Sequence, residues 1–358
     1  MIEARIAKRM APRPDSAGVS LDLEFQAKPG ITALFGSAGA GKTLTFDAIA
    51  GFARPDEGRI MLDDRILFDA ASRVHLKPQQ RNCGYVLQND GLFPHLTIRE
   101  NLVFAADRLP RLERHRRVNE TLERFQLTEA SARHPQQVSR SEKTRCSLAR
   151  AIICSPRVLL LDGLFDGLDA PAVAGLCEIV RNVQGDLEIP VLLATHNLEE
   201  CFQLADRMLL LRDGRIAQSG RPREILEQPA SVEVARLLGI ANLFQAEITA
   251  LDPGRNTSRL RFQEIELTGT YFPGHLRGDR VWLCIRAGDL RVTGRNGARP
   301  EANQVPAKLL RVSDTRQSVQ LEFSGAITVE LAPQEFERQK DNKEWLVEFP
   351  PAALRVLS

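Results

Sequence analysis

The sequence contains no hydrophobic run that approaches the roughly 18 apolar residues needed to cross a bilayer. Hydrophobic residues make up 43% of the 358 positions and charged residues 26%, which is an ordinary soluble balance. Residues 1–18 include basic side chains but no apolar segment before a cleavage site, so we do not expect a secretory signal. These absences predict a cytosolic protein that does not itself span a membrane.

Six cysteines occur without a CxxC pair or a Cys/His cluster of metal-ligand spacing. This pattern indicates reduced, buried thiols rather than a disulfide framework, and it gives no indication of a metal site. The 48 basic and 46 acidic residues leave a net charge of +2, so bulk charge gives no argument for a nucleic-acid partner. Motifs must therefore indicate the function. The cysteines are Cys83, Cys146, Cys154, Cys177, Cys201 and Cys284.

Residues 1–230 alternate short apolar runs with helix-length segments, a pattern typical of an α/β domain with a largely parallel sheet. We expect buried strands at 31–35, 83–88, 157–162 and 190–195. A hairpin is expected at 207–220, because Asp213-Gly214 between two apolar strands is a strong signal for a type I′ turn. The arginine-rich segment 108–125 predicts an exposed helix inserted between the second and third strands.

The pattern changes after Pro229. A helix through Leu237 is expected to end at Gly239, a typical C-terminal stop. From about Leu243 onward, short strands separated by turn residues predict a small all-β domain of barrel type. We therefore expect a first domain at 1–230, a linker at 231–242 and a second domain at 243–358.

The segment GSAGAGKT at 36–43 fits the phosphate-binding P-loop, and it lies between a predicted strand and a predicted helix, as the motif requires. Glycines let backbone N–H groups curl around phosphate oxygens, and the helix N-terminus adds the positive end of its dipole. The sequence thus predicts a P-loop NTPase with ATP and Mg²⁺ as ligands, Lys42 at the β- and γ-phosphates and the Thr43 hydroxyl on the metal. The expected nucleotide-binding residues of this loop are Gly36, Ser37, Ala38, Gly39, Ala40, Gly41, Lys42 and Thr43.

A carboxylate for the metal is also present. The run RVLLLD predicts an apolar strand with Asp162 at its C-terminal end, where α/β sheets place their ligands. An isolated aspartate in this position usually caps a helix. Together with the P-loop it is expected to be the Walker B aspartate that helps to hold Mg²⁺.

These motifs resemble the ABC-transporter ATPases, and within that family the molybdate-import type, over nearly the whole chain. RNCGYVLQ at 81–88 is similar to the family's Q-loop, FDGLD at 165–169 to its D-loop and ATHNLEE at 194–200 to its switch loop. The resemblance implies a helical subdomain at about 89–155. It also implies a catalytic contact of Gln88 with Mg²⁺ and the attacking water, and a catalytic contact of His196 with the γ-phosphate.

The resemblance extends to partners and to the second domain. It implies a homodimer or heterodimer of ATPase subunits, bound to transmembrane permease subunits at the cytoplasmic face of the inner membrane. The second domain resembles the family's OB-like accessory (TOBE/MOP) domain, which can bind an oxyanion. ANQVP at 302–306 matches only part of the molybdate-loop pattern, and the acidic Glu301 would oppose an oxyanion, so structural packing is the expected role of that loop.

The family's signature, Leu-Ser-Gly-Gly, stands here as Val138-Ser139-Arg140-Ser141. In the family this segment completes the partner's site, so Ser139 is expected to contact the partner's nucleotide. The two glycines that allow close approach are replaced. The side chains of Arg140 and Ser141 could block the closed dimer, or Arg140 could itself contact phosphate.

A second departure affects hydrolysis directly. The family places a glutamate after the Walker B aspartate to act on the attacking water, and this position is Gly163. Loss of a general base typically slows a reaction roughly 10²- to 10⁴-fold, so binding of ATP is expected and its hydrolysis is doubtful. Asp166 and Asp169 follow, but their D-loop positions give no reason to expect that they substitute. Residues 7–20 contain no aromatic residue to stack on adenine.

Three functions are consistent with these features. The first is the energy-coupling ATPase subunit of an importer for molybdate or a related oxyanion. The second is a non-hydrolytic ATP-binding switch, or the silent partner in a heterodimeric pair, which the changes at Gly163 and Arg140 favour. The third is an anion-binding or storage protein, against which the incomplete loop at 302–306 argues.

Overall fold

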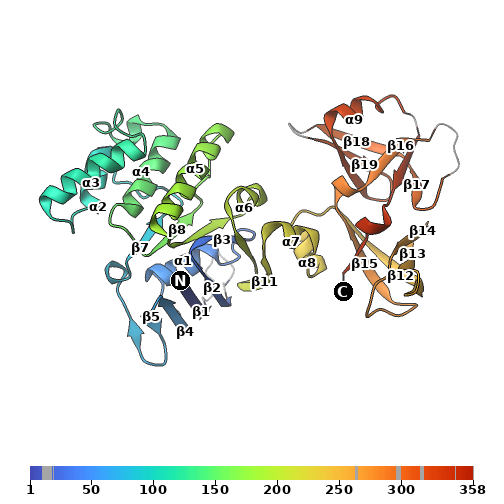
Figure 1. Ribbon diagram of the computed structural model, residues 1–358, viewed down its shortest axis with the longest axis horizontal. Helices are drawn as coiled ribbons and strands as arrows, with labels where there is room; N and C mark the ends of the chain where they lie inside the picture. Colours follow the sequence, from blue (N-terminus) through green and yellow to red (C-terminus); the bar gives the residue numbers. More distant parts are fainter. Residues whose placement is uncertain are drawn as a thin grey trace. The chain divides into compact units, whose positions relative to one another are not determined.

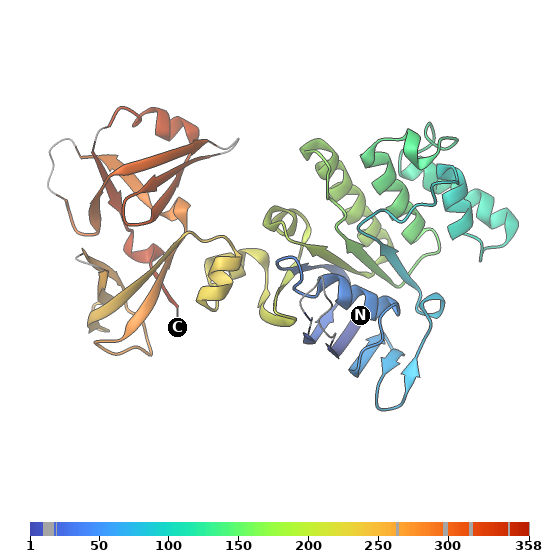
Figure 2. The same ribbon diagram turned by 180° about the vertical axis from the view of Figure 1, so that it is seen from behind.

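The computed structural model describes residues 1–9, 18, 20–262, 265–295, 300–314, 318–342 and 344–357. The chain divides into two compact units, Met1–Ile225 and Leu226–Ser358, called unit 1 and unit 2 below (Figure 1, Figure 2). Among the described residues, no helix has both the length and the apolar character that a membrane crossing needs.

Unit 1 begins with an antiparallel sheet in the order β2-β1-β4-β5-β6. In β2, every second residue is buried, which is the alternation expected of a sheet with one face on the core. The hydrophobic face of this sheet packs against α1, Lys42–Ala50, where Phe46 and Ile49 are fully buried. The strands are β1 Ile2–Arg9, β2 Ser20–Ala27, β4 Glu57–Leu62, β5 Arg65–Asp69 and β6 Val74–His75.

The second sheet of unit 1 runs in the order β11-β10-β3-β9-β8-β7, with all neighbours parallel except the β10–β11 hairpin. The hairpin turn has positive φ at both Asp213 and Gly214, as a type I′ turn requires. The predicted strands are all present, although β7 ends at Val86, two residues earlier than expected. The strands are β3 Gly30–Phe35, β7 Cys83–Val86, β8 Val158–Asp162, β9 Pro190–Thr195, β10 Arg207–Arg212 and β11 Arg215–Gly220.

Both faces of this second sheet are covered, which explains why its central strands are continuously apolar. Leu159 and Leu161 of β8 pack with the helices α2, α4 and α5, whereas Leu160 packs on the α1 side. Figure 1 shows α2 to α5 gathered on one side of unit 1, away from β1, β4 and β5. The helices are α2 Ile98–Ala105, α3 Arg111–Arg124, α4 Arg140–Ile152, α5 Ala170–Leu187, α6 Leu198–Leu204 and α7 Pro222–Glu227, with short 3₁₀ turns η1 Pro78–Gln80 and η2 Pro135–Gln137.

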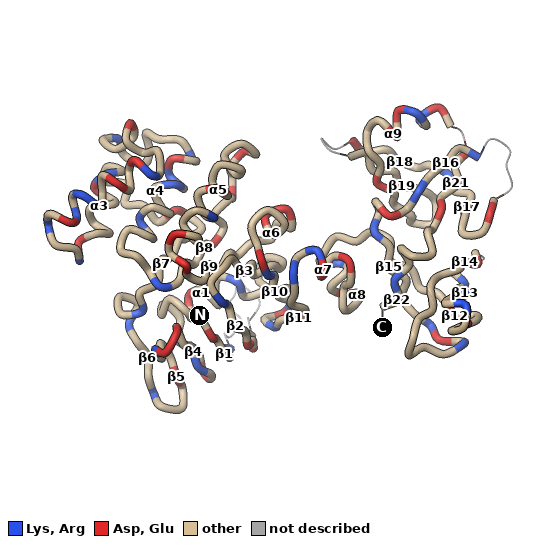
Figure 3. The backbone as a smooth tube through the Cα atoms, in the orientation of Figure 1, with Lys and Arg blue, Asp and Glu red and all other residues tan. Residues whose placement is uncertain are grey.

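The arginine-rich helix α3 is mostly exposed, as its composition predicts, and buries only Val118, Thr121 and Leu122. Figure 3 shows basic and acidic residues interspersed along both units. This mixing agrees with the small net charge of the sequence.

Unit 2 contains helix α8, Val232–Leu237, followed by Gly239 with φ 74°. The described residues after it form three antiparallel sheets around one hydrophobic core. The all-β character predicted for this part of the chain is therefore confirmed. The first sheet has the order β14-β13-β12-β15-β22, the second β16-β21-β17 and the third β18-β19-β20. Trp345 and Phe349 are among the largest fully buried side chains of their common core.

The elements of unit 2 are β12 Asn242–Asp252, β13 Thr257–Phe262, β14 Ile265–Thr270, β15 Arg280–Ile285, β16 Arg291–Gly294, β17 Gln304–Ala307, β18 Leu309–Asp314, β19 Val319–Phe323, β20 Ile327–Leu331, α9 Pro333–Glu337, β21 Trp345–Glu348 and β22 Arg355–Leu357. Two 3₁₀ turns, η3 Ala287–Asp289 and η4 Pro351–Ala353, complete them.

Candidate functional site

The loop that joins β3 to α1 has the backbone that a phosphate cradle needs. Gly39 and Gly41 adopt φ values of 81° and 102°, which other residues rarely adopt. A Cβ atom on Gly36 would lie 2.5 Å from the carbonyl oxygen of Leu211, so this position also requires glycine. Gly41 precedes α1 directly, and no described side chain caps that helix, which leaves its first N–H groups available to an anion.

The side chain of Lys42 folds back onto this loop. Its Nζ donates hydrogen bonds to the carbonyl oxygens of Gly36 at 2.7 Å and Ser37 at 2.9 Å. Burial lowers the pKa of Lys42, and the negative charges of Asp162 and Asp166 oppose that change. The ammonium group is thus held where phosphate oxygens can replace the two carbonyls as its acceptors.

Asp162 ends β8 with only 6% of its surface exposed. Burial raises the pKa of the Asp162 carboxyl, while the hydrogen bond from the Thr43 side chain lowers it. A hydroxyl and a carboxylate thus lie side by side, and both supply the hard oxygen ligands that Mg²⁺ prefers. The described residues include no group of three or more acidic, histidine or cysteine side chains that could hold a metal alone. The pair therefore fits Mg²⁺, which usually completes its shell with phosphate oxygens and water.

A cavity of about 310 Å³ brings most of the predicted residues together. Its walls include predicted residues from the P-loop, β8, the Q-loop and the switch loop: Ala38, Gly39, Gly41, Lys42, Thr43, Asp162, Gln88 and His196. Gly36, Ser37 and Ala40 belong to the same loop but do not line the cavity, and Ser139 is also absent from its walls. Additional wall residues are Leu44, Gly163, Asp166, Ala194 and Thr195.

The switch loop is anchored next to His196. Thr195 Oγ1 donates to Glu200 Oε2 at 2.5 Å and accepts from the Asn197 backbone N–H at 2.9 Å. Burial raises the pKa of Glu200, and the hydrogen bond from Thr195 opposes that rise. The imidazole of His196 is exposed while the backbone on both sides is fixed, so the side chain can reach a ligand from a rigid base.

Gly163 follows Asp162 with φ 57°, and the space above it is occupied. A Cβ atom there would lie 2.6 Å from Asp166 Oδ2 and 2.9 Å from Gln88 Cγ. Gln88 Nε2 donates to Asp166 Oδ2 at 3.3 Å. From the sequence we had no reason to expect Asp166 to substitute for the glutamate, yet Asp166 lines the cavity. An acidic residue four positions after the Walker B aspartate was the only available signal.

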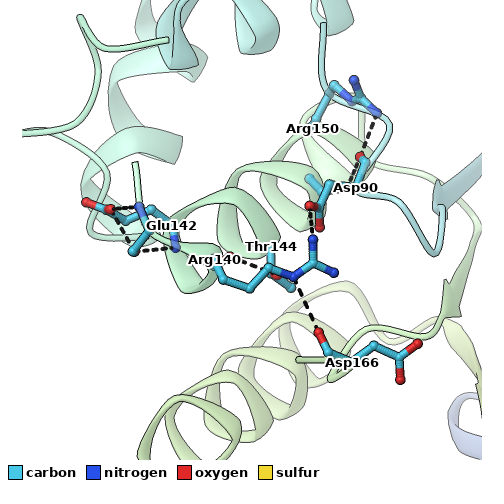
Figure 4. Close-up of polar contacts among 8 residues, drawn as sticks. Asp90, Arg140, Glu142, Thr144, Arg150 and Asp166 are labelled. Carbon is cyan, nitrogen blue, oxygen red and sulfur yellow. Dashed lines mark hydrogen bonds and ion pairs between the residues drawn. The ribbon is translucent and has the colours of Figure 1, made fainter. Parts of the chain in front are cut away.

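The signature-like segment is occupied by contacts within its own chain (Figure 4). Arg140 pairs with the carboxylate of Asp90, and its Nε donates to the carbonyl oxygen of Asp166 at 3.3 Å. The two sequence alternatives for Arg140, a steric block or a phosphate contact, did not include this arrangement. Ser139 is the N-cap of α4, where its hydroxyl donates to Glu142 Oε2 at 2.7 Å and accepts from the Glu142 N–H at 3.2 Å.

Other residues of α4 hold the chain just beyond Gln88. Ser147 Oγ donates to the carbonyl oxygen of Asp90 at 2.6 Å, and Arg150 Nη1 donates to that of Gly91 at 2.5 Å. Burial raises the pKa of the Asp90 carboxyl, whereas the charge of Arg140 lowers it. The Q-loop segment and α4 therefore form one connected polar network.

In unit 2, the segment 302–306 is only partly a loop, because strand β17 begins at Gln304. Asn303 is 7% exposed, with φ 64°. Its Nδ2 donates to the carbonyl oxygens of Thr268 at 2.7 Å and Phe349 at 2.8 Å, and its Oδ1 accepts from the Thr268 N–H at 2.6 Å. Both amide donors are thus used within the chain, while Glu301 is exposed.

Residues 7–20, which contain no aromatic residue to stack on adenine, lie partly outside the described residues, since 10–17 and 19 are not described.

The chain shows clear similarity to known proteins. A family model described as ABC transporter matches residues 20–165. The molybdenum import ATP-binding protein ModC of Rhodospirillum rubrum is 37% identical over 232 residues, which span 65% of this chain and 63% of that protein. ModC of Paramagnetospirillum magneticum is 34% identical over 76% of this chain and 75% of its own length.

Other relatives have different stated cargoes. The spermidine/putrescine import ATP-binding protein PotA of Oleidesulfovibrio alaskensis is also 34% identical, over 76% of this chain and 72% of that protein. The solved dimeric structure of the ATP-binding cassette MJ0796 with ADP and Pi has a TM-score of 0.54 at 21% identity, covering 62% of this chain and 99% of that one, and it supports the fold. On this similarity and on the geometry of the cavity, the chain belongs to the ABC-transporter ATP-binding proteins.

Proposed function

We propose that the chain is the ATP-binding, energy-coupling subunit of an ABC importer for molybdate or a related oxyanion. The observation that carries the proposal is the convergence of the P-loop, Asp162, Gln88 and His196 on one cavity. Two ModC relatives at 34–37% identity support molybdate as the cargo. The PotA relative makes a polyamine the main competing cargo.

Different residues of this chain would bind different parts of the nucleotide. Lys42 would exchange the carbonyls of Gly36 and Ser37 for the β- and γ-phosphates, and the loop N–H groups would receive phosphate oxygens. Thr43, Asp162 and Gln88 would hold Mg²⁺, which supplies positive charge to neutralise the phosphates. His196 would donate a hydrogen bond to the γ-phosphate from its anchored loop.

Closure of two ATPase subunits on ATP would then move the permease. We place this assembly, a homodimer or a heterodimer bound to transmembrane subunits, at the cytoplasmic face of the inner membrane. Ser139 would face the partner's nucleotide, which fits its position outside the cavity of its own chain. Rigid attachment of the Q-loop segment to α4 provides a route from the cavity to the helical subdomain.

The second candidate is a switch or silent partner that binds ATP without hydrolysing it. Gly163 in the glutamate position favours it, and so does the engagement of Arg140 within its own chain. A partner with an intact glutamate and signature would be required for one active site. The presence of a second ATPase gene beside this one would support this candidate.

Transport in the native organism tests the proposal. A strain that lacks this gene should lose uptake of labelled molybdate and regain it with the natural gene, but not with Lys42→Ala. The matched control is Glu178→Gln, an exposed position on α5, which should restore uptake fully. Normal molybdate uptake in the deletion strain, or a loss confined to polyamine uptake, would contradict the proposed cargo.

A further inference from the structure

The absence of a side chain at residue 163 does not leave an empty space. With φ 57° at Gly163, any L-residue would be strained, and its Cβ would collide with Asp166 Oδ2. The backbone therefore accommodates the neighbouring carboxylate at the point where the family's glutamate would begin. This relationship connects the glycine at 163, which departs from the family, with the carboxylate of Asp166.

The Asp166 carboxylate lies among the charged and polar residues of the candidate nucleotide site. Asp166 lines the cavity together with Lys42, Asp162 and His196, and its carboxylate accepts a hydrogen bond from Gln88. The charges of Lys42 and Asp162 interact with it, as does that of Glu200. In this position a carboxylate can accept a hydrogen bond from a water that approaches a phosphate held over Lys42.

The backbone of Asp166 is held from two sides. Its N–H donates to the carbonyl oxygen of Gly163 at 3.2 Å, and its carbonyl oxygen accepts from Arg140 Nε. Figure 4 shows the Asp166 carboxylate pointing away from Arg140. Arg140 is in turn fixed by Asp90. Arg140 thus restrains the main chain of Asp166 without engaging its carboxylate.

We propose that Asp166 takes the role of the missing glutamate and is the catalytic carboxylate that orients and polarises the attacking water. The inference rests on the proposed function, because it requires Mg-ATP in the cavity. In the reaction, the water oxygen forms a bond to the γ-phosphorus. The bond from phosphorus to the bridging oxygen breaks, its electron pair leaves on ADP, and the proton given up by the water leaves with inorganic phosphate.

The test is single-turnover hydrolysis of Mg-ATP with the full-length chain in excess, so that subunit association does not limit the rate. The natural protein should exceed the Lys42→Ala blank. Asp166→Asn, which keeps the shape and loses the charge, should be slower by roughly 10²- to 10⁴-fold. Glu178→Gln should match the natural protein. Thermal unfolding of each variant checks that the fold is retained.

Equilibrium binding of Mg-ATP separates this inference from the proposed function. Asp166→Asn should bind as tightly as the natural protein or more tightly, because a negative charge near the phosphates is removed. An unchanged rate in Asp166→Asn would overturn the catalytic role. Natural protein that binds Mg-ATP but turns over at the blank would also overturn it and would favour the silent-partner reading. A chain that does not bind Mg-ATP would overturn the proposed function itself.

Substitution at residue 163 gives an independent readout. Gly163→Glu alone should hydrolyse ATP more slowly than the natural protein, because the new side chain displaces Asp166 and places two carboxylates together. Combining it with Asp166→Ser removes the collision and the repulsion, so the double variant should be faster than Gly163→Glu. A Gly163→Glu variant that is faster than the natural protein and gains nothing from Asp166→Ser would contradict the proposal.

Discussion

The guanidinium of Arg140 is bound to the carboxylate of Asp90, a residue 50 positions earlier in the chain. The same guanidinium contacts the main chain of Asp166. One side chain at the start of α4 therefore connects the end of the Q-loop segment to the D-loop. Arg140 stands where the family has a glycine that allows a partner subunit to approach. In this chain its side chain connects two loops of the same subunit.

Removal of the Arg140 side chain should destabilise unit 1. Arg140→Ala removes the ion-pair partner of the nearly buried Asp90 side chain, and we expect a loss of about 1–2 kcal/mol in the free energy of unfolding, between the values for exposed and buried pairs. Asp90→Asn should lose less, because an amide oxygen still accepts from Arg140. Urea denaturation of the three proteins measures the difference. Equal stability of Arg140→Ala and the natural protein would show that the pair contributes nothing.

The capping box of α4 should produce an acid-dependent stability. The pKa of Glu142 is lowered, first by the hydrogen bond from the Ser139 hydroxyl and then by that from the Ser139 backbone. A carboxyl with a lowered folded-state pKa stabilises the fold above its ordinary pKa, and this contribution is lost as the pH falls through the folded-state value. The natural protein should therefore be more stable than Glu142→Gln at pH 7.

That advantage should shrink as the pH falls below the ordinary glutamate value of 4.5. Glutamine at this position keeps the capping geometry, so the comparison isolates the charge. Urea midpoints measured across the pH range provide the check. A stability difference that is independent of pH would exclude ionised Glu142 as its cause.

Asn303 should be important for the fold of unit 2. Asn303→Ala removes three hydrogen bonds and adds strain at positive φ, and we expect a loss of roughly 2–4 kcal/mol, since buried partners are left unsatisfied. Asn303→Gly loses the same bonds without the strain and should be the milder variant. Calorimetry of the full chain should show the effect in the transition of unit 2. An unchanged transition with molybdate binding abolished would instead indicate an anion-binding role.

Local motifs were predictable from the sequence because each consists of contiguous residues. The P-loop residues 36–43, the buried strand before Asp162 and the turn at Asp213-Gly214 all follow from short patterns, and the structure has each of them. The inserted helix at Arg111–Arg124 was similarly clear from its arginine-rich, exposed pattern. Placement of Gln88 and His196 in one cavity required the family resemblance, because their positions depend on the strand order.

The role of Asp166 could not be predicted in this way. It depends on the left-handed backbone of Gly163 and on a contact from Arg140, which lies 26 positions away. A comparison with the family motif one position at a time shows only that the glutamate is missing at Gly163. The three-dimensional arrangement shows that another carboxylate fills the same space, which is a relationship between residues rather than a property of one.

Binding of Mg-ATP to the purified full-length chain tests the central claim most directly. We predict saturable binding at or below millimolar nucleotide, its loss in Lys42→Ala, and weaker binding when Mg²⁺ is chelated, because Lys42, Thr43 and Asp162 form one phosphate and metal site. Isothermal titration calorimetry with a slowly hydrolysed ATP analogue gives the affinity. No binding at millimolar Mg-ATP, or equal binding by Lys42→Ala, would contradict the account.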